Sequence, residues 1–247
     1  MKIVINPKYE LLGAFIKSVP DIFEKEGKLI YKARNQLKIY QTEDFEVIVK
    51  SFKRPHLINR IVYGFFRFSK ARRSYEHALE LLKRGVPTPE PIAYVEEKKA
   101  GLLNRSYYVC VFEKEFSVIR EEMLGLRGDK SFLKALATFI ADIQNKGVLF
   151  FDMSPGNILS KTENGKVSFT LVDINRIKFL SHISLNNRYK NFERIAEKRE
   201  IIDELAGEYA KIMSLNIEDT IREIHKHIAN YSRNYHKMNL AEVYKNL

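Results

Sequence analysis

The feature that most constrains this chain is a predicted β-hairpin that turns at Asn164-Gly165. The run after the turn alternates apolar and polar side chains, which is the period of a strand, and an apolar start precedes it. Asn-Gly between two such runs is a strong hairpin signal, because both turn residues need positive φ. With this turn, Asn157 lies opposite Val172. We therefore expect Asn157 and Asp173 to stand side by side at the open end of the hairpin.

Oxygen-bearing side chains gather at this open end. The amide oxygen of Asn157 and the carboxylate of Asp173 can share one hard cation such as Mg²⁺, whose favoured ligands are oxygens. Asp152 remains on the preceding loop to meet a substrate hydroxyl. The pattern D-x-x-x-x-N, followed by a hairpin and a second Asp, is the arrangement of the protein-kinase catalytic loop. The plain alternative is an ordinary Pro-Gly-Asn turn with carboxylates nearby.

Composition limits the class of protein. The 247 residues, 45% of them hydrophobic, suffice for one large domain or for two lobes sharing a cleft. Lys and Arg total 42 against 31 Asp and Glu, and the net charge of +11 favours a polyanionic partner. One cysteine, Cys110, excludes an internal disulfide and fits a reducing cytosol. No apolar run approaches the length of a bilayer span, and Met1–Pro7 is broken too early for a signal peptide.

The first part of the chain predicts a small antiparallel sheet and one helix. Strands are expected at 29–31, 36–40, 45–50 and 107–112, whereas residues 1–28 carry little signal. A helix is expected from about Lys70 to Arg84, capped by Ser69 and stopped by Gly85. No G-x-G-x-x-G sequence lies between the first two strands, so a loop covering phosphates there must work without glycines.

Two charged residues of this part are candidates for a phosphate site. Lys50 ends the apolar run Val47-Ile48-Val49, and a lysine there either reaches phosphates or snorkels from a sheet edge. Glu76 flanks the apolar stripe of the predicted helix, so its carboxylate faces either the sheet or water.

The second part predicts a mainly helical lobe. Apolar residues between Phe132 and Ile143 mark an amphipathic helix closed by Gly147, which delivers the chain to Asp152. Further helices are expected at about 201–209 and 217–228. We therefore predict an α+β, bilobal fold, with residues 1–113 as the N-lobe and residues 114–247 as the C-lobe.

A basic, aromatic segment lies between Glu46 and Glu76. This segment contains no acidic residue. Cations interleaved with aromatic residues, such as Tyr63, Phe65 and Phe66, fit an element that dips into a membrane while its cations meet anionic headgroups. The alternative is a helix packed on the sheet by its aromatic face. Nothing in the segment specifies a nucleic-acid motif, so no nucleic-acid partner is expected.

Several stretches together resemble the lipopolysaccharide core kinases, the Kdo/WaaP family. They are Val49–Pro55, Ser69–Glu76, Gly85–Pro91, Asp152–Leu159 and Val172–Arg176. The resemblance implies a protein-kinase-like two-lobed fold. It also implies that Mg-ATP is used to phosphorylate an inner-core sugar of lipopolysaccharide, Kdo or heptose, on the cytoplasmic side of the inner membrane.

Residue roles follow from the same resemblance. Lys50 would hold the ATP phosphates and Glu76 would pair with Lys50. Asp152 would be the catalytic base, and Asn157 and Asp173 would hold magnesium. The expected partners are a lipid-linked sugar acceptor of the Kdo–lipid A type and an anionic membrane surface. The oligomeric state is left open.

Three departures from the kinase pattern stand out. Phe150 occupies the position of the histidine of H-x-D, which is mainly architectural, and Asn175 replaces the glycine of D-F-G. No A-P-E motif follows Asp173, which argues against an ordinary regulated protein kinase. We therefore predict a sugar kinase with Kdo as acceptor. The alternatives are a small-molecule kinase of the aminoglycoside or choline type and a non-catalytic, membrane-associated scaffold.

Overall fold

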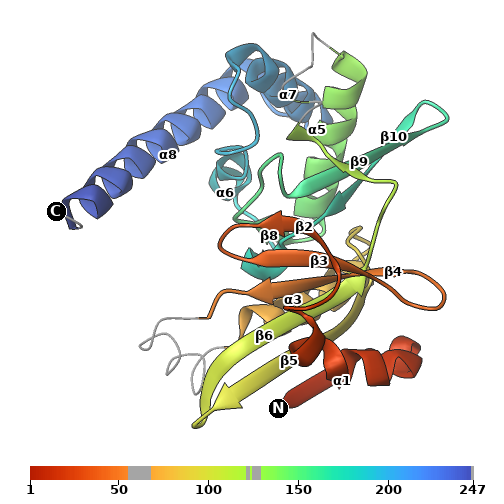
Figure 1. Cartoon of the computed structure of the whole chain (residues 1–247). Coiled ribbons are helices and arrows are strands. Elements are labelled where there is room, and N and C mark those ends of the chain that lie inside the picture. The colour runs from red at the N-terminus through yellow and green to blue at the C-terminus, as the bar shows by residue number, and fades with distance from the viewer. Residues whose placement is uncertain (55–67, 121–122, 124–128, 246–247) are drawn as a thin grey trace. The chain divides into compact units, whose positions relative to one another are not determined.

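The fold is that of a computed structural model, which describes residues 1–54, 68–120, 123 and 129–245, with side chains up to Asn234. The chain forms two compact units (Figure 1). The N-terminal unit comprises residues 1–114 and 173–175, and the C-terminal unit comprises residues 115–172 and 176–247. An antiparallel sheet in the first unit and helices in the second confirm the predicted α+β class. The roles predicted for the two lobes stay predictions.

The N-terminal unit is built on a six-stranded sheet in the order β1-β5-β6-β4-β3-β2, in which all neighbours are antiparallel. The strands are β1 Lys2–Ile5, β2 Lys28–Lys32, β3 Gln36–Gln41, β4 Glu46–Phe52, β5 Pro91–Lys99 and β6 Leu102–Val111. The four predicted strands are therefore confirmed as β2, β3, β4 and the end of β6. Residues 1–28, which carry little sequence signal, form β1, η1 (Pro7–Leu12) and α1 (Gly13–Ile22).

Helices α1 and α3 complete this unit (Figure 1). Side chains alternate along β6, so that Tyr107 and Val109 belong to one apolar cluster and Tyr108 and Cys110 to the other. The first cluster includes buried residues of α1, and the Phe23 ring after α1 lies 5.4 Å from the Tyr107 ring. The second includes buried residues of α3. The sheet is therefore covered on both faces.

Helix α3 spans Lys70–Lys83, as predicted. The Ser69 side chain accepts a hydrogen bond from the Arg72 amide at 3.0 Å, which caps the first turn. Gly85 follows the helix with φ of 66°, a left-handed conformation that favours glycine. The cap therefore fixes where α3 begins, and with it the positions of Arg72, Arg73 and Glu76 along the helix.

The C-terminal unit is organised around α5, Lys130–Asn145. Asp129 Oδ1 caps it by accepting from the amides of Ser131 and Phe132 at 3.0 and 3.3 Å. Gly147 ends the turn after it with φ of 74°. Helix α7 (Arg199–Ile212) packs on α5, and α8 (Ile217–Lys245) packs on α7. The helices predicted here are confirmed.

Short strands complete the C-terminal unit. They form a three-stranded sheet in the order β10-β9-β7 and a two-stranded sheet in the order β11-β8. Their bounds, with those of the remaining helix, are β7 Ser117–Val118, β8 Val148–Phe150, β9 Ile158–Glu163, β10 Lys166–Leu171, β11 Ile177–Phe179 and α6 Leu185–Lys190. A 3-10 turn, η2, covers Ile174–Arg176.

The segment predicted to meet a membrane is centred on residues 55–67, which lie outside the described residues. In the part of the chain that the structure describes, no helix combines the length and the apolar character needed to cross a bilayer. The two alternatives for this segment therefore stay predictions.

Candidate active site

The hairpin that anchors the site has the predicted register. Lys166 pairs with Glu163 and Leu171 with Ile158. Asn164 and Gly165 have φ of 49° and 73°, so both turn residues are left-handed, as the Asn-Gly pair requires. The pairing continues one step further, because the Val172 amide donates to the Asn157 carbonyl at 3.0 Å. Asp173 is the next residue along the chain.

The loop before the hairpin, residues 152–157, is closed by a hydrogen bond from the side chain of Asn157. Asn157 Nδ2 donates to the Asp152 carbonyl at 2.8 Å, and the Asn157 amide donates to the Ser154 carbonyl at 2.9 Å. Met153 is buried beneath the loop. The structure therefore brings together Asp152 and Asn157, the two residues of the D-x-x-x-x-N pattern. These contacts hold the loop backbone in one conformation and leave the Asp152 carboxylate to other partners.

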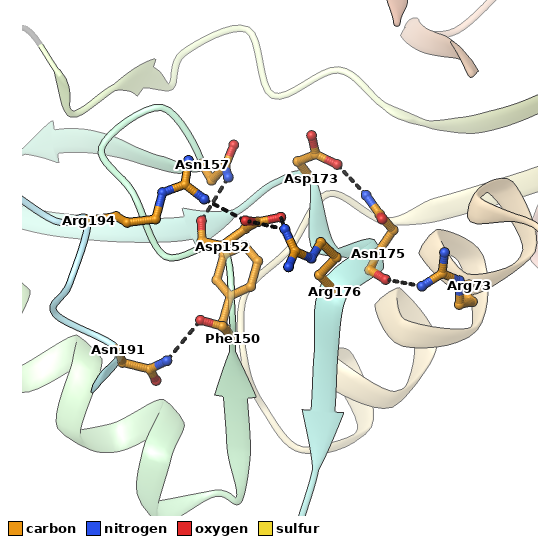
Figure 2. A network of polar contacts seen from close by, with 9 residues as sticks. All are labelled: Arg73, Phe150, Asp152, Asn157, Asp173, Asn175, Arg176, Asn191 and Arg194. Atoms are coloured by element: carbon orange, nitrogen blue, oxygen red, sulfur yellow. Dashed lines mark hydrogen bonds and ion pairs between the residues drawn. The ribbon is translucent and has the colours of Figure 1, made fainter. Parts of the chain in front are cut away.

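Those partners are two arginines. Arg194 contacts Asp152 Oδ1 at 2.6 Å, and Arg176 contacts Oδ1 and Oδ2 at 3.0 and 3.2 Å (Figure 2). The Asp152 side chain is only 16% exposed. Paired, charge-assisted hydrogen bonds of this kind orient a carboxylate strongly. Arg176 ends the stretch Val172–Arg176 that is part of the family resemblance. Arg194 lies far from Asp152 in sequence, and no local pattern points to it.

Asp152 also rests on a buried polar network. Strand β8 ends at Phe150, whose carbonyl accepts from Asn191 Nδ2 at 2.9 Å (Figure 2). Gln144 Nε2 donates to Asn191 Oδ1 at 3.2 Å, and Tyr209 donates its hydroxyl hydrogen to Gln144 Oε1 at 2.7 Å. All four residues are buried. Three elements therefore hold the strand that leads to Asp152, although Phe150 replaces the kinase histidine.

In the N-terminal unit, Lys50 forms an ion pair with Asp173. The distance between Lys50 Nζ and Asp173 Oδ1 is 2.7 Å, and the Lys50 side chain is 11% exposed. Strand β4 has neighbours on both sides, so Lys50 is not the snorkelling edge residue of the alternative interpretation. A charge buried this far needs a partner, and Asp173 supplies one.

Asp173 is held by the residues that follow it. Its φ of 52° is left-handed, and its Oδ1 accepts from Asn175 Nδ2 at 2.5 Å. Arg73 donates to the Asn175 carbonyl at 3.0 Å (Figure 2). The His77 ring contacts the Ile174 carbonyl at 2.8 Å through Nδ1. Burial lowers the pKa of His77. Helix α3 therefore fixes residues 173–175, which is one role for the asparagine at the D-F-G glycine position.

Glu76 has a different partner from the predicted one. Its carboxylate pairs with Arg72 at 2.7 Å and is 40% exposed, whereas Lys50 pairs with Asp173. Among the described residues, no ion pair joins Lys50 to Glu76. Arg72 lies one turn before Glu76 on α3, so this pair needs no tertiary positioning. The pairing of Glu76 with Lys50 therefore stays a prediction.

Lys70 is a cation near Lys50 that its sequence pattern does not reveal. Burial lowers its pKa, and the nearby charges of Arg34, Arg73 and Lys50 lower it further, against the opposing effect of Asp173. Like charges gathered around one carboxylate leave an excess of positive charge. This part of the N-terminal unit is therefore electrostatically suited to phosphate groups.

Asn157 and Asp173 each carry side-chain oxygens of the kind that magnesium binds. Asn157 commits its Nδ2 to Asp152, and within the described residues no hydrogen bond to its Oδ1 is found. Asp173, in the N-terminal unit, has carboxylate oxygens. The described residues contain no group of three or more His, Cys, Asp or Glu side chains arranged to hold a metal by themselves. Mg²⁺ needs none, because it is commonly bound by one or two side chains together with substrate phosphates.

Comparisons with known proteins agree with these observations. The model of the lipopolysaccharide kinase (Kdo/WaaP) family matches residues 24–231. No curated protein matches the chain. A solved structure described as WaaP in complex with acyl carrier protein aligns with a TM-score of 0.64 at 14% identity, covering 96% of this chain and 99% of that one. This likeness confirms the predicted fold.

A second solved structure, of WbdD, gives a TM-score of 0.46 at 13% identity, covering 81% of this chain and 45% of that chain. At this score it supports no conclusion.

Proposed function

We propose that this chain, which belongs to the lipopolysaccharide kinase (Kdo/WaaP) family, transfers the γ-phosphoryl group of ATP to a hydroxyl of Kdo in a lipid-linked acceptor. Membership of this family supports the statement that the chain is a kinase of a lipopolysaccharide sugar. The choice of Kdo rests on the sequence resemblance. One observation carries the proposal: Asp152 and Asn157 form a closed loop at the end of a hairpin whose register is the expected one.

Asp152 is assigned as the general base. Its carboxylate would accept a hydrogen bond from the acceptor hydroxyl and take its proton as the new O–P bond forms. Its buried support through Phe150 and Asn191 favours this role, because a catalytic group must be held closely in place. In such a reaction most of the rate comes from positioning and from electrostatic stabilisation.

Lys50 is assigned to the ATP phosphates. It is a buried cation on a central strand, with Lys70 and Arg73 nearby. A fixed positive charge stabilises the negative charge that spreads over the transferring group. The role of Glu76 as the partner of Lys50 stays a proposal that rests on the resemblance alone.

Asn157 and Asp173 are assigned as the residues that would hold magnesium, each through a side-chain oxygen. When bound, the ion would neutralise charge on the phosphate groups of ATP. Lys50 and Asn175 both contact Asp173 Oδ1. The protein therefore keeps this carboxylate in a defined position by itself.

The acceptor is proposed to be lipid-linked and to be met on the cytoplasmic side of the inner membrane, at an anionic surface. The net charge of +11 and the basic, aromatic segment between Glu46 and Glu76 support this. A soluble acceptor needs no such segment, which separates this proposal from a small-molecule kinase. The non-catalytic scaffold remains the alternative from another class.

Mass spectrometry of reaction products tests the proposal. The purified protein is incubated with Mg-ATP and, separately, with a Kdo-bearing lipid A precursor, a heptosylated core and a generic protein. We expect one added phosphoryl group on the Kdo acceptor. An addition only to the heptosylated core would move the assignment to another sugar of the same pathway. Labelling of the generic protein alone would reject a sugar kinase, and no transfer at all would favour the scaffold.

A further inference from the structure

Two arginines contact the carboxylate of Asp152 in this structure. A carboxylate offers about four lone-pair positions for hydrogen bonds. Contacts at 2.6, 3.0 and 3.2 Å to Arg194 and Arg176 take most of them. A hydroxyl that is to give its proton to Asp152 needs such a position. About one position is left, so loosening one guanidinium contact makes room for the hydroxyl.

The two arginines differ in how firmly they are held. Arg194 is 34% exposed, has the shortest contact, and its guanidinium carbon lies 5.7 Å from the centre of the Tyr231 ring. Arg194 lies between the buried residues Phe192 and Ile195, with Glu193 directly before it. Arg176 is 60% exposed and makes the two longer contacts. Arg176 is therefore the partner whose side chain can leave at lower cost.

The backbone of Arg176 stays in place when its side chain moves. Its carbonyl accepts from the Phe151 amide at 3.1 Å, and the next residue, Ile177, pairs with Phe150 in the β11-β8 sheet. A guanidinium that leaves Asp152 therefore stays attached to a backbone that is held beside Asp152. Any new partner that it finds must lie within reach of the same carboxylate.

The surroundings favour an oxyanion as that new partner. Two guanidiniums face one carboxylate at Asp152, which leaves an excess positive charge. A third, that of Arg120, lies beside the same loop, 2.8 Å from where a Cβ on Gly156 would stand. The planar guanidinium fork matches carboxylate and phosphate groups with two parallel hydrogen bonds. Glu193 is near both arginines, and burial raises its pKa.

We infer that Arg176 is an exchangeable partner, which an oxyanion of the acceptor itself draws away from Asp152. The inference rests on the proposed function. The freed Oδ2 then accepts the hydrogen bond of the acceptor hydroxyl. As the hydroxyl oxygen bonds to the γ-phosphorus, its proton passes to Asp152, and the bond to the bridging oxygen breaks with its electron pair leaving on ADP. The substrate class is a sugar with a carboxylate or phosphate close to the reacting hydroxyl.

Matched acceptors test this on the wild-type protein. The Kdo-bearing lipid A precursor is compared with its Kdo carboxamide and with a form that lacks the lipid phosphates. We expect one neutralised acceptor to lose kcat/KM by about 10–100-fold, the size of one charge-assisted contact. Loss with the carboxamide identifies the carboxylate, and loss without the phosphates identifies a phosphate. Equal transfer to all three overturns the inference and leaves the proposed function standing. Transfer to none overturns both.

Arg176→Gln provides the second arm. With Arg176 gone, the acceptor oxyanion has no guanidinium to draw away from Asp152, so the ratio of kcat/KM for the anionic acceptor to that for the neutral acceptor should fall toward one. Arg176→Lys should restore part of the preference. The control is Arg222→Gln, which breaks an exposed Arg–Asp pair of 2.6 Å on α8. An equal fall with both acceptors would assign Arg176 only to positioning Asp152 and would overturn the exchange.

Discussion

At the scale of single residues, the buried charge of Lys50 in the N-terminal unit is paired with the carboxylate of Asp173. Replacing Lys50 by Met keeps the bulk of the side chain and removes the charge. We expect kcat/KM for ATP to fall by roughly 10²–10³-fold, the range found when one electrostatic donor to a reacting group is lost. Steady-state kinetics at varied ATP measures it.

The matched control for Lys50→Met is Lys98→Met. Lys98 is an exposed lysine on β5 of the same sheet. This variant should keep wild-type kinetics. Equal behaviour of the two variants would remove Lys50 from the nucleotide site.

His77 makes stability depend on pH. Burial lowers its pKa in the folded protein, where its ring contacts the Ile174 carbonyl. In the unfolded chain the histidine pKa is about 6.5. As the pH falls below this value, the unfolded chain takes up a proton that the folded chain resists, so the free energy of unfolding decreases. Between about pH 7 and pH 5, we expect the wild type to lose more stability than His77→Gln.

Denaturant unfolding at several pH values measures this difference. His182→Gln, which changes an exposed histidine, serves as the control and should follow the wild type. A His77→Gln curve parallel to the wild-type curve would contradict the account of His77.

At the scale of elements, the strand before Asp152 depends on α5, α7 and the segment after α6. Asn191→Leu would leave the Phe150 carbonyl and Gln144 Nε2 without this buried partner. An unsatisfied buried polar group costs about 1–3 kcal/mol, so we expect the free energy of unfolding to fall by at least that amount. Kinase turnover should fall as well, because the strand positions Asp152.

Asn186→Leu is the control for Asn191→Leu. Asn186 is exposed on α6, and its Oδ1 contacts His227 Nε2 at 3.1 Å. A surface change of this kind usually shifts stability by no more than about 0.5 kcal/mol. If both variants unfolded alike, the buried network would carry no special support for the loop.

Elements whose signals are local were predictable from the sequence. The hairpin at Asn164-Gly165 has its expected register, α3 has its expected cap at Ser69, and Gly147 follows α5 as expected. Residues 1–28 were not predictable, because β1 is four residues long and α1 contains Pro20, so neither shows a sustained period. The Arg194–Asp152 pair joins residues 42 positions apart, and only tertiary structure brings them together. For the same reason Lys50 has Asp173 as its partner, although Glu76 was expected.

At the scale of the whole molecule, binding of Mg-ATP should stabilise the protein. A ligand that binds only the folded state at 100 times its Kd adds about 2.7 kcal/mol to the free energy of unfolding. We expect the thermal midpoint of the wild type to rise with Mg-ATP. In Asp173→Ala, the part of this rise that depends on magnesium should be lost. ATP with EDTA is the control. No rise for the wild type would favour the non-catalytic scaffold.

The turnover of Asp152→Asn tests the central claim most directly. The substitution keeps the shape of the side chain and removes its ability to take a proton. With the Kdo-bearing lipid A precursor as acceptor, we expect kcat to fall by a factor on the order of 10²–10⁴. The thermal shift with Mg-ATP should remain, which shows that the variant is folded and binds nucleotide. Wild-type turnover in this variant would contradict the assignment of Asp152 as the base.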